Sequence, residues 1–243
     1  MIINTKILNG KRALITGATG GIGKAISNTL AESGCDLFLT ASNDVALHDL
    51  ENTLSKYDVR VSVRSSNLLN KEDVYNVVKS ANVCYDHIDI LINSAGIFPN
   101  VPIFEIDDEL FSETINVNFR SAFIFTRELT KNMIDRQWGR IVNIGSSSAY
   151  CGFGGTSIYC ASKHALLGFS RAIHDELKEH NVRTYFISPS STKSKMGLAT
   201  KGQDYSTFLD PYDVAKYVVF AISFDSNIMS EEIFLKRMKI NNG

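Results

Sequence analysis

Cysteine and histidine are scarce in this chain of 243 residues, and neither is arranged for metal binding. The four cysteines, Cys35, Cys84, Cys151 and Cys160, follow no spacing that a zinc site or a compact disulfide framework uses. The five histidines form no HExxH motif. The sequence therefore predicts free, reduced thiols and no metal site.

An excess of one charge and long hydrophobic runs are also missing. The 25 basic and 26 acidic residues give a formal net charge of -1, so no overall field attracts nucleic acid or an anionic membrane. The start, MIINTKILNG, holds no long apolar segment, and the longest apolar run, Tyr217 to Ile222, is far too short to cross a bilayer. We expect a soluble, cytoplasmic protein with no nucleic-acid or membrane partner.

What the chain does contain is a regular alternation of short apolar runs and amphipathic segments. Strands are predicted at 12–15, 36–40, 59–63, 88–92, 140–144, 182–188 and from 232, with helices between them such as 24–33, 71–83 and 107–136. Runs such as Ile88-Asp-Ile-Leu-Ile92 suit parallel strands that helices cover on both faces. The pattern predicts an α/β fold: one domain over residues 1–243, with a doubly wound parallel sheet of about seven strands.

A glycine-rich turn, Thr16-Gly-Ala-Thr-Gly-Gly-Ile-Gly23, joins the first predicted strand to the first helix. Such a turn lets backbone N–H groups approach a pyrophosphate, whose negative charge the helix N-terminus stabilises. Three glycines can also form a simple tight turn, but the strand before them and the amphipathic helix after them are the context of a dinucleotide site. We therefore predict that Gly17, Gly21 and Gly23 bind a dinucleotide.

The second predicted strand ends in Thr40-Ala41-Ser42-Asn43, without the Asp or Glu that bonds the ribose hydroxyls of NAD in such sites. Ser42 can hydrogen-bond a 2′-phosphate, although no Arg or Lys stands at this tip and Asn43 can simply cap the next helix. NADP is therefore favoured over NAD as the cofactor. Asn67 and Leu68, after the third strand, are expected at the edge of the adenine site.

The residues that can carry chemistry follow the fifth predicted strand. Ser146 lies just past that strand, with Ser147 and Ser148 as alternatives should the strand end one or two residues later. Tyr159 and Lys163 are four residues apart, so they lie on one face of a helix. An ammonium close to a phenol lowers the pKa of the phenol, and Tyr159 can then act as general acid or base in carbonyl/alcohol interconversion.

Together these motifs resemble the short-chain dehydrogenase/reductase family. Its TGxxxGxG motif is matched by residues 16–23, its YxxxK motif by residues 159–163, and its NNAG motif, with one change, by Asn93-Ser94-Ala95-Gly96. The likeness extends from Gly10 to about Ser194, and segments such as Ile141-Val-Asn-Ile-Gly-Ser146 are most similar to 3-oxoacyl-[acyl-carrier-protein] reductases. The resemblance implies a Rossmann fold that binds a nicotinamide dinucleotide.

The resemblance also implies a catalytic tetrad. Tyr159 would be the acid/base, Ser146 would hold the substrate oxygen, and Lys163 would lower the Tyr159 pKa and hold the nicotinamide ribose. Asn118, where the helix over 107–136 is expected to be interrupted, would fix a water on the proton path. Cofactor contacts are implied for Tyr159 and Lys163 and for these residues: Gly17, Thr19, Gly20, Gly21, Ile22, Gly23, Ser42, Asn67, Leu68, Asn93, Ala95, Gly96, Pro189, Ser190, Thr192 and Ser194.

The resemblance further implies a homodimer or homotetramer, formed through helices around 119–132 and 157–179. On the second of these, Leu166, Leu167, Phe169 and Ile173 could serve such an interface or simply the core. A flexible loop near 190–210 is expected to cover the substrate. Its lysines could recognise an anionic substrate or simply be solvated, and they are Lys193, Lys195 and Lys201.

Some departures from the family bear on the substrate. Pro189-Ser190 and Ser194 replace a usual Pro-Gly and a Thr, an exchange that the nicotinamide contacts should survive. Gln137 and His180 stand where the acyl-carrier reductases have carrier-docking arginines, and the tail lacks their glycine-rich ending. These differences weaken the case for a carrier-bound substrate.

The sequence thus predicts an NAD(P)(H)-dependent oxidoreductase that interconverts a carbonyl and a secondary alcohol. A 3-oxoacyl thioester is one candidate substrate, and a sugar or another small alcohol is the alternative. A catalytically silent nucleotide-sensing protein is the rival from another class. The presence of all four tetrad residues speaks against it, because a chain freed from chemistry has no physical reason to keep them.

Overall fold

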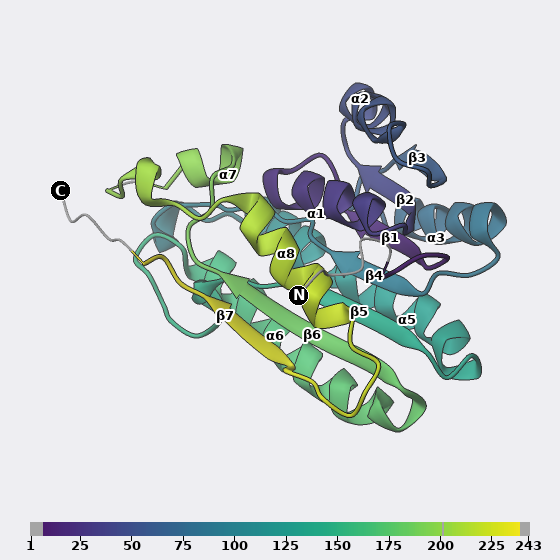
Figure 1. Cartoon of the computed structure of the whole chain (residues 1–243). Helices are drawn as coiled ribbons and strands as arrows, with labels where there is room; N and C mark the ends of the chain where they lie inside the picture. Colours follow the sequence, from purple (N-terminus) through teal and green to yellow (C-terminus); the bar gives the residue numbers. More distant parts are fainter. Residues whose placement is uncertain (1–6, 201, 239–243) are drawn as a thin grey trace.

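Seven parallel strands form one sheet in this computed structural model, which describes residues 7–200 and 202–238. Their spatial order is β3-β2-β1-β4-β5-β6-β7, so the chain starts mid-sheet, builds one half outward and then builds the other (Figure 1). This topology confirms the predicted doubly wound α/β fold. The strands are β1 (Arg12–Thr16), β2 (Asp36–Ala41), β3 (Val61–Ser65), β4 (Ile90–Asn93), β5 (Gly139–Ile144), β6 (Val182–Pro189) and β7 (Glu232–Leu235).

Helices cover both faces of the sheet (Figure 1). One face is packed by α1 (Gly21–Glu32), α2 (Asp44–Leu54) and α8 (Pro211–Ile222), and the other by α3 (Lys71–Tyr85), α5 (Ser121–Asp135) and α6 (Ser157–Leu177). Strand residues alternate between the two cores: in β4, Ile90 and Ile92 join the first and Leu91 joins the second. Burial on both faces is why these strands are continuous apolar runs in the sequence.

The long helix predicted over 107–136 is interrupted, as expected. It consists of α4 (Asp108–Ile115) and α5, joined by a π-helical turn, η2 (Asn116–Arg120). A π turn is rare and is often found at functional sites. The remaining short elements are η1 (Ile103–Glu105), η3 (Ser147–Ala149), η4 (Lys178–His180), α7 (Lys195–Leu198) and η5 (Tyr205–Thr207).

The apolar residues singled out on α6 belong to the core of the chain itself. Leu166, Leu167 and Ile173 are buried, and Phe169 is half-buried against two core clusters. Their burial in a single chain accounts for their hydrophobic character without a second subunit.

None of the helices within residues 7–200 and 202–238 has the length and hydrophobicity needed to cross a membrane. In the same two ranges, no group of three or more His, Cys, Asp or Glu side chains could hold a metal ion. The four cysteines are free thiols.

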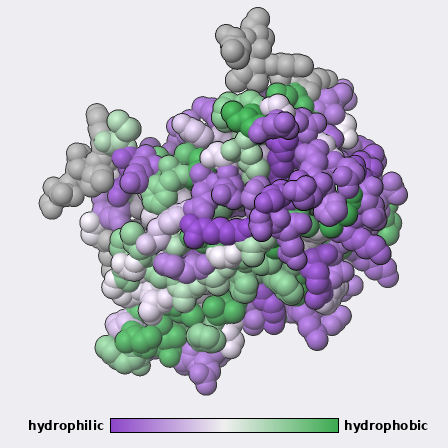
Figure 2. Space-filling view, turned by 90° about the horizontal axis from the view of Figure 1, so that it is seen from below, coloured by the Kyte–Doolittle hydropathy of each residue, from purple (hydrophilic) through white to green (hydrophobic). Residues whose placement is uncertain are grey.

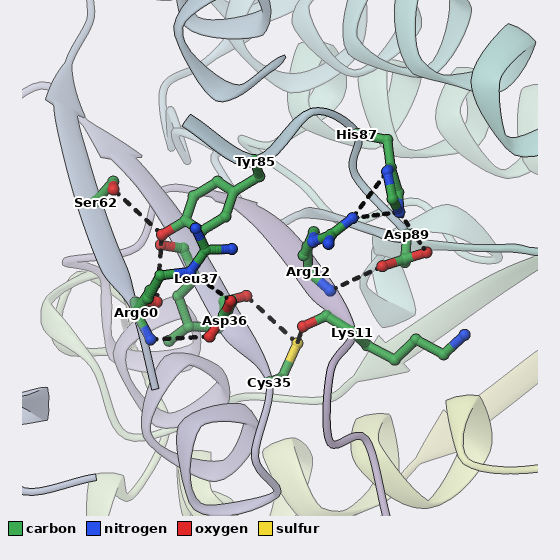
Figure 3. A network of polar contacts seen from close by, with 10 residues as sticks. All are labelled: Lys11, Arg12, Cys35, Asp36, Leu37, Arg60, Ser62, Tyr85, His87 and Asp89. Atoms are coloured by element: carbon green, nitrogen blue, oxygen red, sulfur yellow. Dashed lines mark hydrogen bonds and ion pairs between the residues drawn. The ribbon is translucent and has the colours of Figure 1, made fainter. Parts of the chain in front are cut away.

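A buried polar network joins the amino ends of β1 and β4 (Figure 3). Asp89, only 2% exposed, accepts hydrogen bonds from the backbone N–H of Arg12 at 3.0 Å and from Arg136 Nη2 at 3.3 Å. His87 Nε2 lies 3.5 Å from the same carboxylate and 2.6 Å from Arg12 Nη1. Because a buried carboxylate is tolerated only when it is paired, this network fixes β4 beside β1 at the amino edge of the sheet.

Replacing Asp89 tests the weight of this network. Asp89→Ala should lower the free energy of unfolding by about 2 kcal/mol, because it removes a buried acceptor and leaves the part-buried Arg12 N–H and the Arg136 guanidinium, 43% exposed, without their partner. The measurement is the urea midpoint at an unchanged slope. The control is Asp175→Ala, whose carboxylate is 80% exposed beside Lys178 and whose loss should leave the midpoint nearly unchanged. Equal midpoints for the two variants would contradict this role of Asp89.

Candidate active site

The carboxyl ends of β1 and β4 are held together by a threonine and two glycines. Thr16 Oγ1 accepts hydrogen bonds from the backbone N–H groups of Ser94 at 3.1 Å and Ala95 at 3.2 Å. Gly17 has φ +62°, and a Cβ there would lie 2.7 Å from Ala95 Cα. A Cβ at Gly23 would overlap the Gly17 carbonyl oxygen. The turn can therefore take this shape only with glycine at both positions.

The N-terminus of α1 is open to an anion. Gly20 is its N-cap, and within the described residues no side chain caps this helix or places an acid in its first turn. By contrast, Asn43, Asn70, Asp107 and Asp210 cap α2, α3, α4 and α8. Uncapped N–H groups at the positive end of a helix fit a pyrophosphate. Predicted cofactor contacts lie in or next to this turn: Gly17, Thr19, Gly20, Gly21, Ile22 and Gly23.

The tip of β2 and the loop after β3 lie at the same edge of the sheet. Ser42 is exposed there, and Asn43 caps α2 through its side chain, as the sequence suggested. Asn67 Oδ1 accepts a hydrogen bond from the backbone two residues further on, and Leu68 is half-buried. These positions suit the adenosine half of a dinucleotide.

Two buried polar atoms among the predicted cofactor contacts have no partner in the described part of the chain. Asn93 donates through Nδ2 to Asn143 Oδ1 at 2.8 Å, but its own Oδ1 is unpaired. Ser190 donates its backbone N–H to Leu235 O at 2.8 Å, and its Oγ is unpaired. Orphaned buried groups of this kind indicate an external partner, so the carboxyl edge fits a polar cofactor.

The π turn brings Asn118 into contact with the segment after β4. Its side chain is 1% exposed: Oδ1 accepts from Ile97 N at 2.8 Å, while Nδ2 donates to Ile97 O at 3.0 Å and Ser162 Oγ at 3.0 Å. A Cβ at Gly96 would lie 3.3 Å from Asn118 Oδ1 and 3.8 Å from Lys163 Nζ. Asn118 and Lys163 therefore lie close together beside Gly96, and Asn118 joins the β4 segment to α6.

Ser146 and Tyr159 converge at the end of β5. The strand ends at Ile144, as predicted, and Ser146 opens the turn η3, with its Oγ accepting a hydrogen bond from Ser148 N at 3.1 Å. Of the three consecutive serines, Ser146 is the one whose hydroxyl is close enough to the Tyr159 phenol to lower its pKa. The two hydroxyls can thus share one oxygen atom of a ligand.

The pKa of Tyr159 differs from expectation. Burial raises it to about 12, and the hydrogen bond from Ser146 offsets only part of that rise. The expected lowering by Lys163 is wrong for this structure, because Lys163 donates to Ile144 O at 2.9 Å, with Nζ 5.8 Å from the centre of the phenol ring. Burial also lowers the pKa of Lys163 to about 8. At neutral pH the phenol is a proton donor, and the amine exchanges its proton readily.

The predicted contacts after β6 lie beside the start of α1. A Cβ at Gly21 would lie 2.8 Å from Ser194 Cβ, so this loop touches the start of α1. Ser194 Oγ caps α7 by accepting from Gly197 N at 2.9 Å, and Thr192 Oγ1 donates to Ser190 O at 2.9 Å. Both hydroxyls thus serve the loop itself. Pro189 ends β6, Lys193 and Lys195 are exposed, and Lys201 lies outside the described residues.

Three residues of the site were missed as site residues by reasoning from the sequence. Phe98 packs edge-on against Tyr159, with ring centroids 4.7 Å apart. Thr16 Oγ1 accepts a hydrogen bond from the backbone of Ser94, and Ser162 Oγ accepts one from Asn118 Nδ2. Only Thr16 carried a signal, as the first residue of the glycine motif, since contacts between distant segments leave no periodic pattern.

Comparisons with known proteins agree with this geometry. The family model described as short chain dehydrogenase matches residues 11–204. A 3-oxoacyl-[acyl-carrier-protein] reductase of Rickettsia prowazekii is 31% identical over 242 residues, covering 97% of each chain. The Rickettsia felis protein of that name is 34% identical over 225 residues, covering 89% of this chain and 90% of its own. In fold, a metagenomic short-chain oxidoreductase solved with NADP superposes with a TM-score of 0.84 at 23% identity, covering 96% of this chain and 99% of its own.

The burial of Lys163 should cost stability. A pKa lowered from 10.5 to about 8 corresponds to a cost on the order of 3 kcal/mol at about 1.4 kcal/mol per pH unit. Lys163→Met removes this cost but also removes the hydrogen bond to Ile144 O, which offsets part of the gain. The free energy of unfolding at pH 7 should therefore rise by about 1–3 kcal/mol. The measurement is denaturant unfolding of both proteins.

The sign of the pH dependence gives a second check. Below pH 8 the lysine is protonated in both states and the cost is complete, whereas above pH 10.5 it is neutral in both and the cost vanishes. The stability gap between Lys163→Met and the unchanged protein should therefore close across this window. A gap that stays constant with pH, or that is matched by the exposed control Lys131→Met, would rule out burial as the cause.

Proposed function

The chain belongs to the short-chain dehydrogenase family of NAD(P)-dependent oxidoreductases, and from that premise we propose that it reduces the ketone of a 3-oxoacyl thioester. The observation that carries the proposal is the convergence of Ser146 and Tyr159 on one point at the end of β5. Two hydroxyl donors there can serve a single carbonyl oxygen. Lys163, on the same helix as Tyr159, completes the group.

The raised pKa of Tyr159 supports the reductive direction. A phenol with a pKa of about 12 is protonated at neutral pH, so it can give its proton to the ketone oxygen. The Ser146 hydroxyl donates a hydrogen bond to the same oxygen and stabilises the negative charge that develops on it. A nicotinamide dinucleotide, when bound, supplies the hydride that the carbonyl carbon receives.

Lys163 and Asn118 would restore the proton. With a pKa of about 8, Lys163 can lose and regain a proton near neutral pH, which suits a relay to the phenol. Asn118 Oδ1 already accepts from Ile97 N and has a second lone pair with which it would fix a water on this path. Lys163 would also bind the nicotinamide ribose.

We propose that NADP is preferred to NAD. Ser42 stands exposed at the tip of β2, with no carboxylate there to repel a 2′-phosphate. The pyrophosphate would lie on the uncapped start of α1, and the unpaired atoms of Asn93 and Ser190 would face the nicotinamide half. The remaining contacts would be Gly17, Thr19, Gly20, Gly21, Ile22, Gly23, Asn67, Leu68, Ala95, Gly96, Tyr159, Lys163, Pro189, Thr192 and Ser194.

The relatives and the loop after β6 support this substrate class. Both Rickettsia relatives are named for reduction of 3-oxoacyl thioesters. Gln137 and His180 contact each other at 3.3 Å before β5 and β6, so this chain has no arginine pair there for a carrier protein. We propose a thioester that binds without such docking, under a loop near 190–210. Arg237 holds that loop by donating to Gln203 Oε1 at 2.9 Å and Thr207 Oγ1 at 3.0 Å.

Self-association is part of the proposal. The chain exposes large hydrophobic side chains on α4 and α5, including Phe111 at 52% and Phe123 at 38%. Figure 2 shows hydrophobic residues gathered on one part of the face seen from below. Contiguous exposed apolar surface favours association, and we propose a homodimer or homotetramer. We also propose that the enzyme works in the cytoplasm, where its free thiols stay reduced.

Turnover tests the function directly. The purified protein should oxidise NADPH with 3-oxobutanoyl-coenzyme A faster than with a keto sugar or a simple ketone, and faster with NADPH than with NADH. The measurement is the loss of reduced-nicotinamide absorbance. Faster turnover of the sugar would overturn the thioester proposal and leave the family assignment intact.

Tyr159→Phe tests the mechanism. It should lower kcat by about 10³-fold, since the proton donor is lost. NADPH affinity, measured by fluorescence titration, should stay within about threefold, because the glycine turn is untouched. Tyr217→Phe, on the exposed side of α8 at 50% exposure, is the matched control and should behave as the unchanged protein. Near-normal kcat in Tyr159→Phe would refute the role given to the phenol.

A further inference from the structure

One carboxylate in the last strand links two elements of the proposed site. Glu232 opens β7, and its Oε2 accepts a hydrogen bond from Tyr150 Oη at 2.6 Å. Arg171 donates to the same carboxylate through Nε at 2.6 Å and through Nη2 at 3.2 Å. Tyr150 and Arg171 are 21 positions apart in sequence and belong to different elements. Glu232 accepts a hydrogen bond from each of them.

Tyr150 closes the turn that Ser146 opens. Ala149 N donates to Ser146 O at 3.0 Å, and Tyr150 N donates to Ser147 O at 3.1 Å, so Tyr150 is the C-cap of η3. Any shift of Tyr150 must move this three-residue turn and, with it, the Ser146 hydroxyl. Ala149 is buried in a hydrophobic cluster and η3 packs against α6, but the hydrogen bonds of a 3₁₀ turn are poorer in geometry than those of an α-helix, so the turn depends on such outside contacts.

The ring of Tyr150 is also fixed. It packs edge-on against Phe186 of β6, with centroids 6.3 Å apart, and against Phe234 of β7 at 5.3 Å. The Phe186 ring fills the space beside Gly145, where a Cβ would overlap it. The phenol of Tyr150 is thus held by aromatic packing on two sides and by the Glu232 carboxylate at its tip.

Arg171 lies on the helix that carries Tyr159 and Lys163. The three residues are on α6, and this helix packs closely against η3. Glu232 therefore bonds both bodies that must be aligned: the turn with the Ser146 hydroxyl and the helix with the Tyr159 phenol. A donor misplaced by about 1 Å can cost on the order of a hundredfold in rate, so such alignment matters for catalysis.

We propose that Glu232 is a positioning residue, which holds the Ser146 turn against α6 through Tyr150 and Arg171 so that Ser146 and Tyr159 meet on one substrate oxygen. This inference rests on the proposed function for its kinetic consequence. It assigns no contact with substrate or cofactor to Glu232.

The charges support a bond that lasts through the working pH range. Hydrogen bonds from Arg171, and then from Tyr150, hold the pKa of Glu232 below its usual range, although burial acts in the opposite direction. Burial, and then the bond to Glu232, raise the pKa of Tyr150 to about 12. The pair is therefore a neutral phenol on a carboxylate at neutral pH, a charge-assisted hydrogen bond. Arg171 is 55% exposed, so its ion pair is screened and the Tyr150 bond contributes more.

The chain offers a matched control of the same composition. Between α5 and α3, Arg127 Nη2 donates to Tyr75 Oη at 2.8 Å, and Arg127 pairs with Glu128 at 2.7 Å. Glu128 is 34% exposed and Glu232 is 27% exposed. An Arg, a Glu and a Tyr thus interact there without touching η3, and Glu128→Gln removes a comparable charge with no path to Ser146.

The test compares Glu232→Gln, Tyr150→Phe and Glu128→Gln. The first two should lower kcat by about tenfold and leave the NADPH KM within about twofold, since α1 is untouched. Tyr150→Phe keeps the ring packing, so it reports the hydrogen bond even should Glu232→Gln fold poorly. Glu128→Gln should match the unchanged protein.

Two further readouts separate positioning from a general loss of stability. The first is hydrogen exchange, which should be faster in residues 145–151 of Glu232→Gln and Tyr150→Phe. The second is the pH profile in the oxidative direction, where Tyr159 must accept a proton. Because the Ser146 bond lowers the Tyr159 pKa, loosening the turn should move the rising limb of the profile to higher pH. A general loss of stability would lower the rate at every pH and leave the midpoint of the pH profile unchanged.

The outcomes divide cleanly. The positioning role is overturned if Glu232→Gln and Tyr150→Phe both have the same kcat as Glu128→Gln. It is also overturned if amide hydrogens in residues 145–151 exchange faster while kcat and the pH midpoint stay unchanged. Should the unchanged protein turn over none of the carbonyls tested, the proposed function fails. In that case hydrogen exchange alone decides whether Glu232 holds the turn.

Discussion

The constraint on which this structure depends is that all seven strands run parallel. Their carboxyl ends consequently lie at one edge, and every loop that follows a strand opens on the same space. The glycine turn after β1, the Asn93–Gly96 segment after β4 and the Ser146 turn after β5 are far apart in sequence and adjacent here. A site made from so many segments requires little from any one of them beyond a short turn.

Burial at that edge sets the chemistry. The helices that cover the sheet exclude water from Tyr159 and Lys163, and the same exclusion drives the two pKa values in opposite directions. The phenol keeps its proton, and the ammonium releases one more easily. A buried lysine costs folding free energy, so the site is less stable than an apolar core would be. On α6, the buried lysine that the proposed chemistry needs therefore lowers the stability of the fold.

The amino edge has the opposite character. There the buried network around Asp89 pairs each charge, and Tyr85 Oη donates to Leu37 O at 2.8 Å beside the Asp36–Arg60 ion pair (Figure 3). In the described part of the chain, the unpaired polar atoms of Asn93 and Ser190 lie at the carboxyl edge. Arg140 Nε, at the amino edge, is unpaired as well, so the difference lies in what the edges hold: ion pairs that stabilise the sheet at the amino edge, and the proposed site at the open carboxyl edge. Glu232 belongs to neither, since it acts from the outermost strand on the turn and helix of the open edge.

The sequence by itself determined the features that depend on local geometry. Alternating apolar runs, the Gly17–Gly23 turn, the spacing of Tyr159 and Lys163 and the break at Asn116–Asn118 are set by backbone conformation over a few residues, and each is found within a few residues of where the pattern placed it. Tertiary structure decided what depends on contacts between distant segments. Burial raises the pKa of Tyr159 although Lys163 lies on the same helix, and both ends of the Asn118 amide are hydrogen-bonded. Ser194 caps a helix, and Glu232 accepts a hydrogen bond from Tyr150. Desolvation and long-range hydrogen bonds are sums over neighbours from the whole fold, and no short stretch of sequence contains them.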